Sequence, residues 1–500
     1  MTGGGEGTAA VTRSLADLGL AAQGGHEARL TGLTADSREV GPGTLFAALP
    51  GSRVHGAIYA RAALAKGAGA LLTDREGAEE ARAALTDHPA PLIVAEDVRA
   101  TFARAAALWF GAQPAVMVAV TGTNGKTSVA SFCRQIWAAL GLPACNIGTT
   151  GVEGAWSGPS PHTTPEPVTL HRMLAAMAAA GVSHAAMEAS SHGLDQRRLD
   201  GVGLSAAGFT NLTQDHLDYH GTMEAYFEAK AGLFTRVLPD DGTAVVWSDD
   251  PWADRLGDLV RARGQRLLSV GTAPGAALRL LGQRFDATGQ DLRFSWAGEP
   301  QMVHLNLIGG FQAANVLIAA GLAIAAGEAP EAVFAVLDRL ETVRGRMQHV
   351  ATRGNGATVF VDYAHTPDAV ATAIAALRPH VLGRIVVVLG AGGDRDRTKR
   401  PLMGRAAAEH ADVVFVTDDN PRSEDPAAIR AAIMAACPEA NEVGDRAEAI
   451  LRAVDALGPG DALLIAGKGH ETGQVIGSDV YPFDDAEQAS VAVAALEGRI

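Results

Sequence analysis

The stretch Gly122-Thr123-Asn124-Gly125-Lys126-Thr127 is the part of this sequence that predicts its fold most directly. It follows an apolar run over residues 116–120 and precedes a helix-like stretch over residues 128–140. A strand, a tight glycine turn and a helix N-terminus form a phosphate-binding loop, because backbone N–H groups and the helix dipole then face phosphate oxygens. Lys126 would reach the outer phosphates, and the Thr127 hydroxyl would contact a magnesium ion. The stretch predicts that the chain binds ATP or GTP.

The glycine spacing departs from the full P-loop pattern, because only two residues separate Gly122 from Gly125, fewer than in that pattern. A glycine-rich turn without a nucleotide role is the alternative interpretation. The Gly-Lys-Thr triplet between a strand and a helix argues against it.

Composition narrows the class of protein. The 500 residues exceed what one hydrophobic core usually serves and indicate about two to four domains. The net charge of −15 argues against a general affinity for nucleic acid or anionic membrane. The three cysteines lack paired or metal-ligand spacing, and no apolar run approaches the ~20 residues that span a bilayer. We expect a cytoplasmic protein with reduced thiols, no membrane span and, since no association segment is evident, a monomeric state.

Alternating strand and helix patterns predict an α/β protein of three domains. These are a smaller N-terminal α/β domain over 1–96, a central P-loop ATPase-like parallel sheet over 97–344, and a C-terminal Rossmann-like, doubly wound domain over 345–500. A helix is expected over 99–110, before the phosphate loop. The strand candidates are 43–49, 70–73, 91–94, 183–187, 206–210, 243–247, 358–362, 384–389, 412–416 and 461–465.

Polar residues follow the predicted strands of the middle segment. Glu188 comes directly after the strand at 183–187, and His216 follows the strand at 206–210. Ligands collect at the carboxyl ends of parallel strands, where these groups would converge on a hydrated magnesium that bridges phosphates. Alone, each would be an ordinary polar group at a strand end. Beside a phosphate loop in one sheet, both become candidate metal ligands.

Four other polar residues invite weaker interpretations. Lys230 lies on a helix-like stretch, and sequence physics alone favours a solvated surface lysine. Asn315 begins an apolar helix and would either bind a base edge or cap that helix. Arg346 and Asp362 flank the start of the third segment, which suits a clamp that forms when domains close over a nucleotide.

Three charged strings in the last segment, at 392–397, 419–422 and 467–471, each follow a predicted strand and should face one crevice. An arginine can grip a carboxylate in bidentate fashion, and Glu471 can hold an ammonium group. The combination predicts an amino-acid ligand, and ordinary loop polarity is the alternative.

Together these strings resemble the Mur ligase family of peptidoglycan synthesis, which are ATP-dependent amide-forming enzymes, over essentially the whole chain. The phosphate-loop string is shared with folylpolyglutamate synthases and indicates only the superfamily. More selective are the strings at 190–198, 362–365, 394–396 and 467–471, which look like the tripeptide-forming branch. The string Asp419-Asn420-Pro421-Arg422 resembles the members that add diaminopimelate. Arg422 would pair with the second carboxylate, and bound lysine would leave this cation buried and unpaired.

The resemblance implies a role for each matching residue. ATP would contact Gly122, Thr123, Asn124, Gly125, Lys126, Thr127, Ser128, Asn315, Arg346 and Asp362. The UDP-muramoyl-dipeptide would contact Ala35, Ser37, Ser52, Arg53, Val54, His162, Thr163, Thr164, Ser190, Gln196 and Arg198. Diaminopimelate would contact Arg395, Asp419, Asn420, Pro421, Arg422, Gly467 and Glu471. Mg²⁺ would be held by Thr127, Glu188, His216 and Lys230. The resemblance implies that Lys230 is carbamylated, in contrast to the solvated surface lysine that the residues alone favour. His162, Ala35 and residues 52–54 depart from the family pattern.

The implied reaction joins diaminopimelate to UDP-MurNAc-L-Ala-D-Glu through an acyl phosphate, with Lys126, Glu188, His216 and Lys230 as the catalytic set. It would serve peptidoglycan synthesis, and through it cell shape and cell division.

The alternatives are a folylpolyglutamate synthase, the ligase that adds D-Ala-D-Ala, a non-catalytic nucleotide-binding regulator and an NTPase motor. The first two should lack Arg422, the regulator should lack Lys126 or Glu188, and the motor needs an acidic strand end that is not evident.

Overall fold

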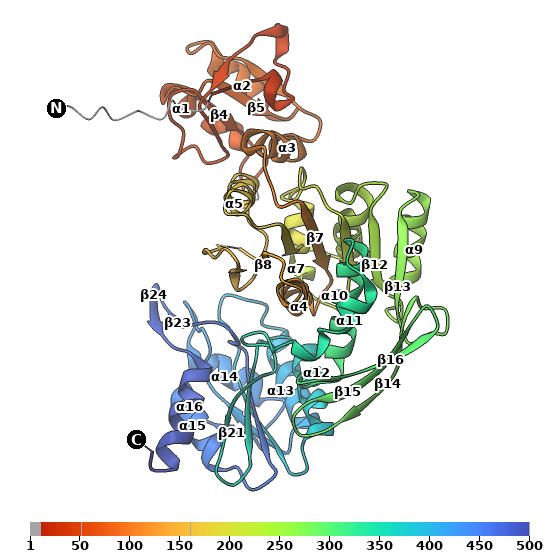
Figure 1. Cartoon of the computed structure of the whole chain (residues 1–500). Coiled ribbons are helices and arrows are strands. Elements are labelled where there is room, and N and C mark those ends of the chain that lie inside the picture. Colours follow the sequence, from red (N-terminus) through yellow and green to blue (C-terminus); the bar gives the residue numbers. More distant parts are fainter. Residues whose placement is uncertain (1–11, 52, 161, 500) are drawn as a thin grey trace, which may run out of the picture. The chain divides into compact units, whose positions relative to one another are not determined.

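The computed structural model describes residues 12–51, 53–160 and 162–499. The contacts divide the chain into two compact units, and Figure 1 labels many of the helices and strands named below. Among the described residues, the first unit is drawn from residues 12–119, 143–207 and 228–242, and the second from residues 120–142, 208–227 and 243–499. The predicted α/β class with several parallel sheets is confirmed. The predicted boundaries after residues 96 and 344 stay predictions.

The N-terminal part of the first unit contains a four-stranded parallel sheet of short, largely buried strands. Its strands are β3 (Gly32–Thr34), β4 (Thr44–Ala47), β5 (Ala70–Thr73) and β6 (Leu92–Val94). Side chains alternate between the two faces of a strand. Phe46 therefore packs in one hydrophobic cluster and Leu45 in the other. Helix α3 (Val98–Phe110) covers the Leu45 face, begins at the Asp97 cap and ends at the left-handed Gly111.

The rest of the first unit continues from β7 (Val116–Thr121), whose last two residues belong to the second unit. Strands follow in the order β7, β10 (His184–Glu188), β8 (Ala144–Gly148) and β9 (Gly151–Gly154). Strands β10 and β8 are parallel, and β9 turns back antiparallel. Helices α5 (Pro167–Ala179) and α6 (Ser191–Asp195) flank β10 in the sequence. Glu188 is the last residue of β10, one residue beyond the predicted end of that strand.

In the second unit, α4 (Lys126–Ala139) follows the phosphate loop and packs against α10 (Phe311–Ala325). The strand order is β7, β11 (Ala206–Phe209), β12 (Thr243–Trp247), β13 (Arg266–Gly271), β14 (Leu278–Phe285), β15 (Gln290–Trp296) and β16 (Glu299–Leu305). Sequence analysis missed β14, β15 and β16, which are antiparallel. Their half-exposed side chains lack the apolar runs that marked the parallel strands.

The last part of the second unit is a doubly wound sheet. Its order is β17 (Gln348–Thr352), β18 (Thr358–Asp362), β22 (Ala462–Ala466), β19 (Ile385–Leu389), β20 (Val413–Val416) and β21 (Asn441–Glu442). Only β17 runs antiparallel. Val387 faces the cluster that contains α12 (Pro367–Leu377) and α13 (Lys399–His410), whereas Val386 faces the cluster with α15 (Arg446–Asp455) and α16 (Asp485–Leu496). Both faces are buried, which explains why these strands read as apolar runs.

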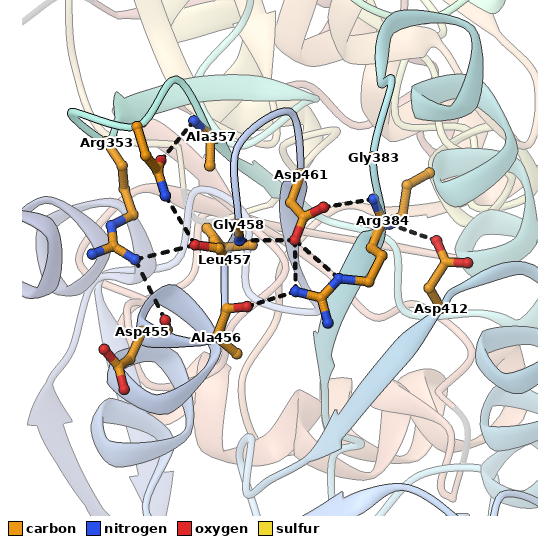
Figure 2. A network of polar contacts seen from close by, with 12 residues as sticks. Arg353, Ala357, Gly383, Arg384, Asp412, Asp455, Ala456, Leu457, Gly458 and Asp461 are labelled. Atoms are coloured by element: carbon orange, nitrogen blue, oxygen red, sulfur yellow. Dashed lines mark hydrogen bonds and ion pairs between the residues drawn. The ribbon is translucent and has the colours of Figure 1, made fainter.

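A polar network ties together the amino-terminal ends of β18, β19 and β22 (Figure 2). The Asp461 carboxylate accepts hydrogen bonds from the Arg384 backbone N–H at 2.7 Å, from its Nε at 3.0 Å and from its Nη2 at 2.7 Å. Arg353 Nη1 donates to the Val454 carbonyl at 2.9 Å. The predicted ligand loops follow the opposite, carboxyl ends of these parallel strands, so this network stabilises the domain away from them.

Candidate functional site

The phosphate-binding loop connects β7 to α4 in the predicted way, although α4 begins at Lys126 and not at residue 128. Gly122 has a φ of 147° and Gly125 a φ of 88°, both in the region that favours glycine. A Cβ atom on Gly122 would lie 1.8 Å from Thr210 Oγ1, and one on Gly125 would lie 2.4 Å from Asn315 Oδ1. Backbone and neighbouring side chains approach so closely here that only glycine fits.

The Lys126 side chain lies over this loop. Its Nζ donates to the Gly122 carbonyl at 2.9 Å and to the Thr123 carbonyl at 2.8 Å. The loop is fixed from the β11 side, where Asn211 Oδ1 accepts from the Asn124 N–H at 3.0 Å. Thr127 and Ser128 are buried in the first turn of α4, at the positive end of the helix dipole. The arrangement suits a bound phosphate group.

Asn315 lies within α10 and is almost fully buried. Gly310 occupies the N-cap position, so the interpretation of Asn315 as a helix cap is wrong. Its side-chain Nδ2 donates to Gln312 Oε1 at 3.0 Å, and its Oδ1 lies against Gly125. Contact with a nucleotide base stays a prediction.

Arg346 and Asp362 occupy the junction before the doubly wound sheet. Arg346 Nη2 donates to Thr127 Oγ1 at 3.2 Å, which brings the predicted clamp arginine to the phosphate loop. Asp362 Oδ2 accepts from the Met347 N–H at 2.7 Å, where Met347 has a φ of 50°. Burial raises the pKa of Asp362, and the positive charge of Arg346 opposes that rise. The guanidinium of Arg346 also lies 4.7 Å from the centre of the Tyr363 ring.

His216 adopts a left-handed conformation with a φ of 53°, directly after the loop that follows β11. Its Nε2 lies 3.3 Å from a carboxylate oxygen of Asp215. Its ring meets the edge of Tyr226, whose hydroxyl is 3.3 Å from Thr123 Oγ1. These contacts connect His216 to the phosphate loop within the second unit.

Glu188 is 1% exposed at the end of β10. The Thr149 N–H donates to Glu188 Oε1 at 2.8 Å, and the Thr149 hydroxyl donates to Glu188 Oε2 at 3.3 Å. The Thr149 hydroxyl also lies 3.0 Å from Thr163 Oγ1. Sequence analysis missed Thr149 because it did not predict β8, the strand that Thr149 directly follows.

The residues predicted to bind the muramoyl dipeptide come together beside Glu188. Thr164 Oγ1 donates to the Glu188 carbonyl at 2.9 Å and accepts from the Ser190 N–H at 3.0 Å. Arg198 Nη1 donates to the Thr164 carbonyl at 2.7 Å, and its Nη2 donates to Gln196 Oε1 at 2.8 Å. His162 is exposed, and its carbonyl accepts from the Ser160 hydroxyl at 2.6 Å.

The predicted uridine contacts follow neighbouring parallel strands of the first sheet. Ala35 and Ser37 come after β3, whereas Arg53 and Val54 come after β4, and the side chains of Arg53 and Val54 are exposed. Lys66 Nζ donates to the Ser37 carbonyl at 2.9 Å. Ser52 lies outside the described residues.

Lys230 lies near the end of α8 (Met223–Gly232) and is only 1% exposed. The residue-based interpretation of a solvated surface lysine is therefore wrong. A buried lysine needs a counter-charge or a chemical modification, because an isolated ammonium group is costly to bury. Its burial is compatible with the role that the family resemblance implied.

The three strings of the C-terminal sheet lie at the carboxyl ends of β19, β20 and β22, as predicted. Asn420 Nδ2 donates to Glu471 Oε2 at 2.9 Å. Arg422 has a φ of 52°, and its Nη1 donates to the Gly393 carbonyl at 2.8 Å. The side chain of Arg395 is exposed. Burial raises the pKa of Glu471, and Asn420 and Lys468 are among the groups that oppose the rise. Asp419 and Pro421 are buried, and a Cβ atom on Gly467 would lie 2.7 Å from Asp419 Oδ2.

The candidate metal ligands Thr127 and Glu188 each carry oxygen donors. Over residues 12–51, 53–160 and 162–499, no cluster of three or more His, Cys, Asp or Glu side chains has metal-binding geometry. Hydroxyl and carboxylate oxygens such as Thr127 Oγ1 and those of Glu188 are the ligands that Mg²⁺ prefers, with waters completing its shell. Among the described helices, none has the length and apolar character of a membrane-crossing segment.

Three family models match this sequence. They are "Mur ligase family, catalytic domain" at residues 29–109, "Mur ligase middle domain" at 120–323 and "Mur ligase, glutamate ligase domain" at 345–469. The chain belongs to the Mur ligase family. The predicted resemblance is therefore confirmed, and this Mur ligase is an ATP-dependent ligase of peptidoglycan synthesis.

Curated relatives of this Mur ligase carry the name UDP-N-acetylmuramoyl-L-alanyl-D-glutamate–2,6-diaminopimelate ligase. The protein from Caulobacter vibrioides is 51% identical over 476 residues, which are 94% of this chain and 96% of that protein. The protein from Bradyrhizobium diazoefficiens is 50% identical over 93% of this chain and 95% of that protein.

A solved structure of an enzyme with the same name has a TM-score of 0.69 to this Mur ligase at 34% identity, covering 94% of this chain and 95% of that one. A Mycobacterium tuberculosis folylpolyglutamate synthase has a TM-score of 0.59 at 21% identity, covering 78% of this chain and 92% of that one. At that identity the likeness shows a shared fold alone.

Proposed function

We propose that this Mur ligase adds diaminopimelate to UDP-MurNAc-L-Ala-D-Glu and releases ADP and phosphate. The observation that carries the proposal is the loop Asp419–Arg422, where Asn420 contacts Glu471 and Arg422 adds a positive charge beside them. Near-full-length similarity to ligases named for this reaction supports it.

The reaction needs two displacement steps. The terminal carboxylate of the dipeptide attacks the γ-phosphorus of ATP, forming an acyl phosphate as ADP leaves. The free amine of diaminopimelate then attacks the acyl carbon, phosphate leaves, and the nitrogen loses a proton. Lys126 and Arg346 supply positive charge where the phosphoryl group is transferred, which is the main source of catalysis in such reactions.

Selection of diaminopimelate over lysine would rest on Arg422. Diaminopimelate presents a second carboxylate, which a guanidinium binds in bidentate fashion. Lysine would leave Arg422 without this counter-charge, and an unpaired cation in a half-buried site reduces affinity. Glu471 would hold an ammonium group of the substrate, and Arg395, Asp419, Asn420, Pro421 and Gly467 would complete the site.

The remaining assignments follow from the family resemblance. Thr163, Thr164, Ser190, Gln196 and Arg198 would bind the muramoyl dipeptide, with His162 beside them. Ala35, Ser37, Ser52, Arg53 and Val54 would bind the uridine nucleotide. Asn315, Asp362 and the loop from Gly122 to Ser128 would bind ATP.

Magnesium, held by Thr127, Glu188, His216 and a carbamylated Lys230, would offset negative charge on the phosphates. The burial of Lys230 and the grip of Thr149 on Glu188 support these two assignments. We also propose that the protein is a cytoplasmic monomer and that its reaction serves cell shape and cell division.

The test measures phosphate release from ATP and UDP-MurNAc-L-Ala-D-Glu with meso-diaminopimelate, LL-diaminopimelate, L-lysine or no amino acid. We expect turnover with a diaminopimelate isomer, little with lysine, and a product one residue heavier by mass spectrometry. Arg422→Gln should lose most of this discrimination, whereas Arg405→Gln, an exposed arginine on α13, should keep it. Equal turnover with lysine in the unaltered protein would refute the specificity, and turnover without the muramoyl dipeptide would refute the reaction.

A further inference from the structure

Lys468 is a completely buried cation, with 0% of its surface exposed, in the loop after β22. Its Nζ donates to Asn420 Oδ1 at 3.0 Å and to the Gly473 carbonyl at 2.9 Å. The same nitrogen lies 3.3 Å from Asp419 Oδ1 and 3.9 Å from Glu471 Oε2. One ammonium group therefore joins the loop after β20, the loop after β22 and the start of β23 (Gly473–Ile476).

These contacts determine which way the Asn420 amide points. Asn420 Oδ1 accepts from Lys468 Nζ and from the Val475 N–H at 2.9 Å. With the oxygen occupied by two donors, the Nδ2 group must face the other side, where it donates to Glu471 Oε2. If the amide were reversed, its N–H groups would face an ammonium and an N–H donor, which cannot accept hydrogen bonds.

Lys468 also places a positive charge beside the carboxylates of Asp419 and Glu471. Asp419 Oδ1 has no hydrogen-bond partner among the described residues, so its ion contact with Lys468 offsets much of its burial cost. The charged or titratable groups that act on Glu471 are Asp419, Lys468 and Arg422, and Glu471 in turn acts on Tyr363 and Arg446. Lys468 lowers the pKa of Glu471, against the effect of burial.

We propose that Lys468 is a positioning residue for the incoming amino acid, because it orients Asn420 and keeps Glu471 poised to accept the substrate ammonium group. The inference rests on the proposed function of the loop Asp419–Arg422 as the amino-acid site. Lys468 itself need not touch the substrate, because its Nζ is enclosed by groups of the protein.

The variant Lys468→Met removes the ammonium group and keeps an unbranched side chain. We expect KM for diaminopimelate to rise by about ten-fold or more, since a hydrogen bond to a charged group is lost and Asn420 can turn. The KM values for ATP and for UDP-MurNAc-L-Ala-D-Glu should change by less than about two-fold. Arg384→Met, which removes a cation from the opposite end of the same sheet, should lower thermal stability and leave all three KM values unchanged.

The pH profile separates positioning from a loss of folding. An ionised Glu471 binds an ammonium group, so affinity for diaminopimelate should fall as pH falls through the pKa of Glu471. Without Lys468 this pKa rises, and the acid limb of the profile should move to higher pH. Lys468→Arg keeps a positive charge and should return the limb towards its original position.

A double-mutant cycle completes the test. If Lys468 acts through Glu471, the KM effects of Lys468→Met and Glu471→Gln should be strongly non-additive. Additive effects, or a Lys468→Met protein whose acid limb and diaminopimelate KM match those of the unaltered protein, would overturn the inference. An unaltered protein that does not use diaminopimelate would instead overturn the proposed function.

Discussion

Arg346 donates a hydrogen bond of 3.2 Å from its Nη2 to the Thr127 hydroxyl of the phosphate loop. The two residues are far apart in the sequence, because Arg346 precedes the doubly wound sheet whereas Thr127 lies in the first turn of α4. Arg346 is also anchored over the Tyr363 ring. The contact links the C-terminal part of the second unit to the phosphate loop.

We therefore expect Arg346→Gln to lower kcat on the order of 100-fold, because a positive charge at the transferring phosphoryl group is lost. Steady-state phosphate release over a range of ATP concentrations measures the effect. Arg344→Gln is the matched control, since Arg344 is half exposed and pairs with Asp484. If the two variants behave alike, Arg346 has no special role at the phosphate loop.

Thr149→Val should raise the magnesium concentration needed for half-maximal turnover by about three- to ten-fold. The change removes the hydroxyl that donates to Glu188 Oε2 but keeps the β-branched shape and the backbone N–H bond. Magnesium titrations of ATP turnover provide the measurement. Thr150→Val is the neighbouring control, because the buried Thr150 hydroxyl has no hydrogen-bond partner among the described residues. Equal magnesium dependence in both variants would contradict a role for Thr149 in holding Glu188.

His171 on α5 should make the protein sensitive to acid. Burial lowers the pKa of His171 from 6.5 to about 4, and its Nε2 has only a long contact of 3.5 Å to the Asp200 carbonyl. A lowered pKa means that the unfolded chain binds the proton more readily. The stability contribution is therefore present above pH 6.5 and is lost as pH falls from 6.5 towards about 4, by about 3–4 kcal/mol in total.

Denaturant unfolding at a series of pH values tests this expectation. His171→Leu should flatten the decline between pH 6.5 and about 4, because the titrating group is gone. His88→Gln, at an exposed position, should leave the decline in place. A decline of unchanged steepness in His171→Leu would assign the acid sensitivity to other groups.

Asp461→Ala should lower the free energy of unfolding by about 2–4 kcal/mol, because the Arg384 N–H and Nε and the Gly458 N–H lose their acceptor, and Arg384 keeps its Nη2 bond to the Ala456 carbonyl. The diaminopimelate and ATP KM values should not change, since the network lies at the amino-terminal strand ends (Figure 2). Asp455→Ala is the control, because the exposed Asp455 contributes its backbone carbonyl, which survives the change. Altered KM values in folded Asp461→Ala would show that this network communicates with the substrate loops.

Sequence patterns predicted many of the parallel strands, because those strands are buried on both faces and read as apolar runs, although the parallel strands β3, β8 and β13 were missed. The strand expected at 358–362 is β18 and the one expected at 243–247 is β12, without any shift. The strands β14 to β16 escaped prediction because one face is solvated, so their side chains mix polar and apolar types. Lys230 was misjudged for a related reason, since a helix-like stretch does not reveal which of its faces is covered.

The sequence by itself determined the α/β class, the family and the candidate ligand residues, because phosphate binding and carboxylate recognition require particular residue types directly after strands. Only the tertiary structure decided which partner each of those residues has. Three hydrogen bonds join segments that are distant in the sequence. They connect Thr149 with Glu188, Arg346 with Thr127, and Lys468 with Asn420. Hydrogen bonds of this kind depend on how strands are ordered in a sheet, and no local pattern of residues specifies that order.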